Sequence, residues 1–225
     1  MSAHKHRSDE NAESKPKDAR EKAVDALMAL AAERTWVEIS MADVADRAGL
    51  SLAQFRDAFP SKGAVLAGFS RRIDRIVLDE TPDDLAGESA KDRLFDVLMR
   101  RFDAMKPYKA ALVHIDAWAM RDPPALAEIN RLAINSLRFM LEAAGESSEG
   151  PLGAVKLQGL VLVWLRTFHV WLDDDSDDSA RTMAALDHEL EQGRVWAARL
   201  DDAGRALAPL ADPLMGLARR LVGAR

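Results

Sequence analysis

The chain has 225 residues, of which 48% are hydrophobic and 30% charged, and it contains no cysteine. This balance is typical of globular proteins and excludes a chain that is disordered throughout. No apolar run approaches the roughly 18 residues that a membrane span needs, and the N-terminus lacks the apolar segment of a secretory signal. Without cysteine there is no disulfide framework and no thiolate metal site. We therefore expect a cytoplasmic protein.

The net charge of −6 is unevenly distributed. Residues 1–75 carry 13 Lys and Arg against 12 Asp and Glu, a net of +1, so the remaining 150 residues carry −7. An acidic protein does not bind polyanions non-specifically. The near-neutral front part still leaves room for a small DNA-reading surface, because phosphate contacts depend on local Lys and Arg.

The front part of the chain predicts several helices after a polar segment. Residues 1–17 are almost free of apolar residues, and we expect a disordered tail there. Ser40 and Asp43 have the spacing of a capping box, which predicts a short helix over 41–48. Gly49 ends that helix, and the same signal at Ser51 and Gln54 opens a second helix that reaches about residue 58. A longer helix is predicted over 63–79.

The rest of the chain also has helical periodicity. Residues 81–87 are rich in Asp, Pro and Gly, and we place a boundary there between domains at 18–80 and 81–225. Helices are then expected over about 90–106, 108–121, 123–144, 151–172, 179–200 and 213–222. No alternating strand pattern of useful length is present. The predicted fold class is all-α, with an N-terminal three-helix bundle and a C-terminal helical domain.

The helix predicted over 151–172 contains an almost unbroken apolar run from Leu160 to Leu165. A helix that is apolar on all sides must bury all sides. In a domain of this size, it does so by packing on its own core and on a second subunit. We therefore predict a homodimer that forms through the helices of about 152–172 and 179–199.

No enzymatic or metal-binding constellation is present. There is no glycine-rich phosphate loop, no GxSxG and no HExxH, so we expect neither an enzyme nor a bound cofactor or metal. The acidic stretch at 173–178 lacks the glycine and the glutamate of a calcium loop. We expect a solvated turn that places negative charge at the next helix N-terminus. The amphipathic helix at 213–222 is expected to cap the bundle, with membrane contact as the alternative.

Residues 41–58 combine an eight-residue helix, a turn of about three residues and a seven-residue helix, which is helix-turn-helix spacing. Ala45 is small where the two helices approach, and Gly49 permits the positive φ of a tight turn. Val44, Leu50 and Phe55 are the apolar residues that would hold the pair together. Two short capped helices also occur in many bundles, so the spacing alone leaves both interpretations open.

A resemblance favours the first interpretation. Residues 20–66 resemble the DNA-binding domain of the TetR family of transcriptional regulators, through the stretch from Ile39 to Ser51 and the segment Phe59-Pro60-Ser61-Lys62. The resemblance implies a dimeric regulator, usually a repressor, whose second helix enters the major groove of a palindromic operator.

The resemblance also implies roles for particular residues. Lys62 matches a lysine that contacts a DNA phosphate, and Ser40 caps the first motif helix near the DNA backbone. Ser51, Leu52 and Gln54 begin the recognition helix, and a glutamine can pair with adenine through two hydrogen bonds. The family often has tyrosine at the position of Arg56 and histidine or tyrosine at that of Ala58. Arg56 can replace a DNA contact that these aromatic rings would make, by reaching a phosphate or a guanine.

Two further expectations concern charge and a second family. We expect Asp57 to face away from DNA, because its charge opposes that of the phosphates. Residues 94–102, 171–174 and 182–187 are similar to the lipid-binding accessory proteins of ubiquinone biosynthesis, which share the TetR-type fold but are thought to have lost DNA binding. The alternative function is therefore a lipid- or quinone-binding protein.

The TetR resemblance implies a pocket for a small apolar ligand between helices of the second domain. Each candidate residue for this pocket has core packing as its ordinary role. The candidates are Leu98, Phe102, His114, Trp118, Leu137, Met140, Trp164 and Phe168.

Overall fold

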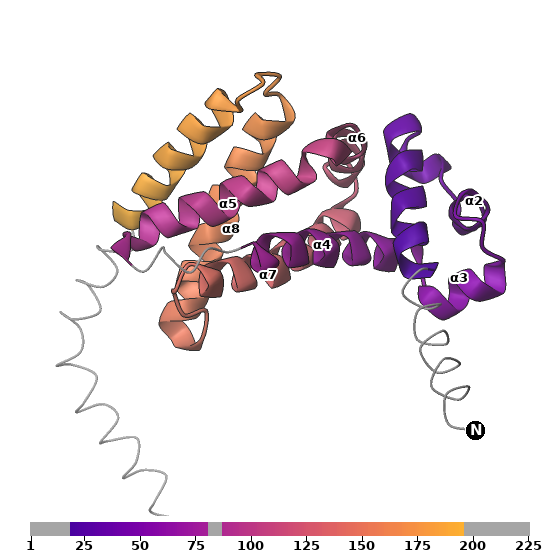
Figure 1. The fold of residues 1–225 in the computed structure, drawn as a ribbon, viewed down its shortest axis with the longest axis horizontal. Coiled ribbons are helices and arrows are strands. Elements are labelled where there is room, and N and C mark those ends of the chain that lie inside the picture. Colours follow the sequence, from indigo (N-terminus) through magenta and orange to yellow (C-terminus); the bar gives the residue numbers. More distant parts are fainter. Residues whose placement is uncertain (1–18, 81–86, 196–225) are drawn as a thin grey trace, which may run out of the picture.

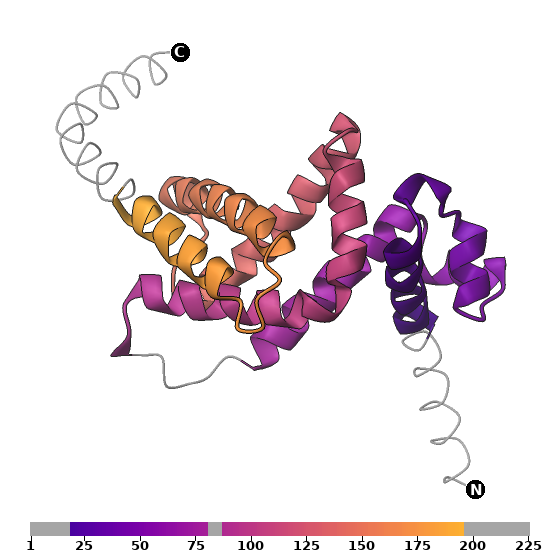
Figure 2. The same ribbon diagram turned by 90° about the horizontal axis from the view of Figure 1, so that it is seen from above.

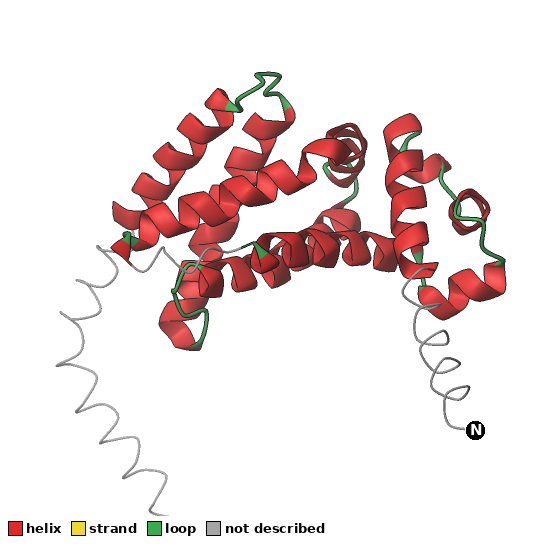
Figure 3. Cartoon of the chain, viewed as in Figure 1, coloured by secondary structure: helices red, strands yellow, loops and turns green. Residues whose placement is uncertain are grey.

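A computed structural model of the chain describes residues 19–80 and 87–195, and all regular structure in these ranges is helical (Figure 3). The predicted tail at 1–17, nearly all of the linker at 81–87 and the helix at 213–222 lie outside the described residues. Figure 1 shows a small head at one end and a larger body beside it. The same division is seen from above in Figure 2.

The head consists of the helix of residues 19–33, the 3-10 helix η1 (Trp36–Glu38), α2 (Met41–Arg47), α3 (Leu52–Ala58) and the start of α4. Val44 and Phe55 are buried between α2 and α3, as the spacing predicts. Gly49 has a φ of 65°, which a residue with a side chain rarely adopts, so the predicted tight turn forms there. α2 and α3 therefore form the predicted helix-turn-helix.

α4 (Lys62–Asp79) runs from the head into the body (Figure 1). Its buried residues recur at helical spacing, and Phe69, Ile73 and Val77 face the core. A buried polar cluster holds its middle: the guanidinium of Arg101 on α5 and the hydroxyl of Ser136 on α7 both donate to Oδ1 of Asp74. This cluster attaches the connecting helix to two helices of the body.

The body is a bundle of helices in which α4 packs on α5 and α7, and α7 packs on α8. The side chains of Ser89 and Asp122 cap α5 and α7, so the capping signals in the sequence mark the true helix starts. The chain breaks at Pro107, as expected, through the short 3-10 helix η3. The bounds are α5 Ala90–Met105, η3 Lys106–Tyr108, α6 Lys109–Ala119, α7 Pro123–Ala143, α8 Gly150–Leu172 and a last described helix at 180–195.

The acidic loop differs from the expectation of a solvated turn. Asp174 is buried, and its carboxylate accepts hydrogen bonds from the backbone and hydroxyl groups of Ser176 and Thr182. Burial opposes the charged form, but these four hydrogen bonds outweigh it and hold the pKa of Asp174 well below its ordinary value. The prediction was wrong for this residue, because a carboxylate with four donors can be buried.

Within the described ranges, every helix is too short or too polar to span a lipid bilayer.

Candidate nucleic-acid interface

α3 exposes one side along its whole length. Phe55 and Ala58 point into the head, whereas Leu52, Gln54 and Arg56 are exposed, and Leu52 shows 59% of its surface to solvent. The predicted recognition residues are thus all accessible, with Leu52 and Arg56 one helical turn apart on one side of α3 and Gln54 on another.

Both motif helices begin with a complete capping box. Ser40 caps α2, with its hydroxyl accepting from the backbone N–H of Asp43 at 3.1 Å. Ser51 caps α3 in the same way, and the side-chain oxygen of Gln54 in return accepts from the backbone N–H of Ser51 at 2.9 Å. Pairing of Gln54 with adenine therefore competes with the cap for its oxygen, while its amide NH₂ stays available.

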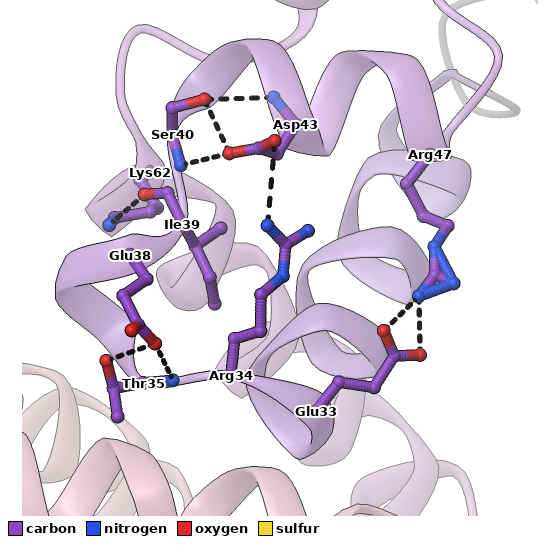
Figure 4. Close-up of polar contacts among 9 residues, drawn as sticks. All are labelled: Glu33, Arg34, Thr35, Glu38, Ile39, Ser40, Asp43, Arg47 and Lys62. Atoms are coloured by element: carbon purple, nitrogen blue, oxygen red, sulfur yellow. Dashed lines mark hydrogen bonds and ion pairs between the residues drawn. The ribbon is translucent and has the colours of Figure 1, made fainter.

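Lys62 lies at the first position of α4 and links it to the segment before α2. Its ammonium donates to the carbonyl oxygens of Trp36 and Ile39, both at 2.5 Å (Figure 4 shows the second), and lies 4.5 Å from the centroid of a Trp36 ring. Partial burial lowers the pKa of Lys62, against which the nearby charge of Asp43 acts weakly. An ammonium has three N–H groups, so one remains for a phosphate.

Two other arginines of the head are held in ion pairs. Arg47 pairs with Glu33 at 2.5 Å, and Arg34 lies 3.7 Å from Asp43 (Figure 4). Within the described residues, Arg56 has no such partner. Its guanidinium is therefore free to meet an anion outside the chain.

Asp57 is also exposed, and it follows Ala53 by one helical turn, so both lie on the outward side of α3. The inward positions of this short helix are taken by Phe55 and Ala58, and the expectation that Asp57 faces away from DNA stays a prediction. The outward surface of α3 thus carries one positive and one negative side chain.

The head contacts the body through α6. The ring of Trp118 stacks on that of Trp36, with centroids 4.8 Å apart and planes at 20°. One turn earlier on α6, Nδ1 of His114 lies 2.7 Å from the carbonyl oxygen of Ala31. Trp36 thus touches both Lys62 and α6, and it joins the start of α4 to the body.

The other six pocket candidates lie in the body. Leu98, Leu137 and Met140 are fully buried, and Phe102, Trp164 and Phe168 form a continuous aromatic stack with centroid distances of 4.6 and 5.9 Å. The structure does not bring His114 and Trp118 to this stack; it places them at the junction with the head.

Trp36 was absent from the sequence-based set of site residues. The available signal was weak: a single tryptophan in a polar segment, separated from Lys62 by 26 positions. Its partners Lys62 and Trp118 come from α4 and α6, so its role depends on packing that the local sequence does not specify.

Comparison with solved structures agrees with this architecture. No family model and no curated protein matches the sequence. Among solved structures, the fold is similar to a TetR transcriptional regulator from Nitrosomonas europaea ATCC 19718, with a TM-score of 0.63 and 22% identity over 78% of this chain and 97% of that one.

Two further regulators show the same likeness. One is a TetR transcriptional regulator from Rhodococcus sp. RHA1, with a TM-score of 0.57 and 20% identity over 79% of this chain and 96% of that one. The other is a tetR-family transcriptional regulator from Streptomyces coelicolor, with a TM-score of 0.55 and 20% identity over 92% of this chain and all of that one. The chain has the fold of the TetR-type regulators, with an N-terminal helix-turn-helix and a C-terminal helical domain.

Proposed function

We propose that this protein is a cytoplasmic, ligand-responsive transcriptional regulator that binds a palindromic operator as a homodimer. The observation that carries the proposal is the accessible outward surface of α3, with Leu52, Gln54 and the unpaired Arg56, next to the remaining donor of Lys62. A helix of this kind fits the major groove, where arginine and glutamine read base edges. We propose repression because the members of the family that the motif resembles are usually repressors.

The surface of α8 supports the dimer. Leu152, Val155 and Leu162 are each about half exposed and follow one another at helical spacing, and Gly159 between them has open space where a side chain would lie. A protein avoids leaving such an apolar strip in water. A second copy of α8, together with the helix at 180–195, is the occupant that we propose.

The junction at α6 supports the response to a ligand. We place an apolar ligand against the aromatic stack of Phe102, Trp164 and Phe168 in the body core. His169 on α8 lies 3.5 Å from Asp116 on α6, and through this contact we propose that a displacement of α8 by the ligand reaches α6. From α6 the contact of Trp118 with Trp36 reaches Lys62. The ligand controls DNA binding only if it prefers one arrangement of the heads.

DNA binding is tested by selecting bound sites from random duplex DNA and measuring affinity by fluorescence anisotropy at several salt concentrations. We expect enrichment of a palindrome with half-sites about one helical turn apart. Arg56→Gln should weaken binding and lower the salt slope by about 1 if the guanidinium meets a phosphate. Arg121→Gln, at an exposed arginine just beyond α6, is the matched control and should change neither.

Gln54→Glu separates base reading from capping. Glutamate serves the capping box as well as glutamine does, but it has no amide donor and accepts from cytosine instead. We expect α3 to stay folded while the preferred base at one operator position changes. An unchanged preference would remove Gln54 from the recognition set. Failure of the wild type to bind any DNA would overturn the regulator and favour the lipid- or quinone-binding alternative.

The dimer is tested by Leu162→Glu, which places a charge in the proposed interface. We expect a monomer by sedimentation and a large loss of operator affinity, because one head contributes only half of the contacts. A dimer that survives this change would contradict the assignment of α8 to the interface. Ala154→Glu, at an exposed position on another side of α8, is the control.

A further inference from the structure

A groove of about 510 Å³ lies at the junction of head and body, away from the aromatic stack. Its walls come from three elements: Arg20 lies on the helix of residues 19–33, Arg71 on α4, and Arg131 with Glu128 on α7. Small-molecule sites in proteins have volumes of about 300–1,000 Å³. The groove therefore has the size of a ligand site and touches both parts of the molecule.

The charge of the groove is positive, in contrast with the acidic chain around it. Three guanidinium groups face one carboxylate, which belongs to Glu128 and pairs with Arg131 at 2.5 Å. Arg20 lies over the ring of Phe59, with 5.2 Å from Cζ to the centroid, and Arg71 has no ion-pair partner within the described residues. Among the residues that the structure describes, Arg20 and Arg71 therefore have no counter-charge in this groove.

The floor of the groove is apolar. It is formed by Phe59, Pro60 and three alanines whose short side chains leave the space open, and Ser61 and Gly63 line the groove beside them; the alanines are Ala58, Ala64 and Ala67. An apolar floor below arginines suits a molecule with a hydrocarbon part and one anionic group. The hydrocarbon part would cover the floor, and the anionic group would accept hydrogen bonds from the guanidinium groups.

We propose that this groove binds a small amphipathic anion, such as a carboxylate with a medium-length hydrocarbon chain. The site is distinct from the core pocket of the proposed function and does not depend on DNA binding. A bound anion would bridge the head, α4 and α7, and so hold the head in one position relative to the body. Phosphates of DNA are the competing anion, because Ala58 at the end of α3 also lines the groove, but its apolar residues favour an anion with a hydrocarbon part.

Octanoate is a suitable probe, titrated into the full chain by isothermal calorimetry. We expect binding of octanoate that Arg71→Gln weakens about tenfold and that the triple change of Arg20, Arg71 and Arg131 to glutamine abolishes. The neutral analogue 1-octanol should bind at least tenfold more weakly than octanoate. Ala67→Leu fills the floor without changing charge and should also weaken octanoate. Arg121→Gln, outside the groove, should leave the affinity unchanged.

Several results would contradict the proposal. Absence of octanoate binding, equal binding of octanoate and 1-octanol, or wild-type affinity in the triple variant would overturn the proposal. The last result would place the ligand elsewhere, for example in the body core. If Arg71→Gln weakens DNA binding but leaves octanoate unaffected, the groove serves DNA and the proposal is wrong. Fluorescence anisotropy with operator DNA, measured on the same variants, distinguishes failure of this proposal from failure of the proposed regulator function.

Discussion

Trp118 of the body stacks on Trp36 of the head, with ring centroids 4.8 Å apart. Trp36 in turn contacts the ammonium of Lys62, at the N-terminus of the connecting helix. The head and the body thus meet at two stacked indole rings. The ring of Trp36 also contacts Lys62, for which we propose a phosphate contact. A change in the position of α6 acts directly on this contact.

The tryptophan pair should contribute to stability beyond the area that it buries. In a double-mutant cycle with Trp36→Leu and Trp118→Leu, we expect a coupling free energy of about 0.5–1.5 kcal/mol in urea unfolding. Trp118→Leu alone should also reduce the response of DNA affinity to a ligand. A coupling energy near zero would show that the stack does not link the two parts.

Asp57 should oppose DNA binding, because it places a negative charge on the outward side of α3. We expect Asp57→Asn to raise operator affinity several-fold at low salt, with a smaller gain at high salt, where screening weakens the repulsion. Fluorescence anisotropy measures both effects. Asp103→Asn, at an exposed aspartate of α5 and outside the helix-turn-helix, is the control. Unchanged affinity in Asp57→Asn would mean that this side of α3 does not face DNA.

Asp174 should stabilise the fold through its charge. Asp174→Asn replaces one carboxylate oxygen by an NH₂ group, so either Ser176 or Thr182 loses its acceptor, and we expect a loss of about 2–3 kcal/mol at pH 7 and a Tm lower by roughly 4–12 °C. Because the pKa of Asp174 is depressed in the folded state, the charged form stabilises the protein above about pH 4, the ordinary value of an aspartate. The stabilisation is lost as the pH falls through the lower folded pKa.

Thermal unfolding of the wild type and Asp174→Asn at several pH values tests this expectation. The gap in Tm between the two proteins should be widest near neutral pH and should narrow as the pH falls below 4. A constant gap would attribute the loss to packing and not to charge. Asp173→Asn, at the exposed neighbouring carboxylate, is the control.

The buried cluster of Asp74, Arg101 and Ser136 should tolerate a double change better than a single one. Arg101→Met leaves the mostly buried carboxylate of Asp74 without its counter-charge, and we expect a loss of about 3 kcal/mol. Adding Asp74→Asn removes the uncompensated charge and should restore more than half of that loss in chemical unfolding. If the double variant is less stable than Arg101→Met, the two side chains do not act as a charge pair.

Much of the helix-turn-helix could be predicted from the sequence, because its determinants are local. The hydroxyl of Ser51 and the amide of Gln54 are three residues apart and satisfy each other's backbone in α3. Gly49 permits the backbone conformation between the helices. Such interactions depend on a few consecutive residues, so the sequence alone determines where α2 and α3 begin and end.

Packing decided what the sequence left open. The stack of Trp36 and Trp118 joins residues 82 positions apart, and the burial of Asp174 depends on Thr182 reaching it from the next helix. The groove beside Arg71 exists only because α7 lies along α4. Contacts of this kind depend on the relative placement of whole helices, which is the sum of many weak apolar contacts and has no local signal in the sequence.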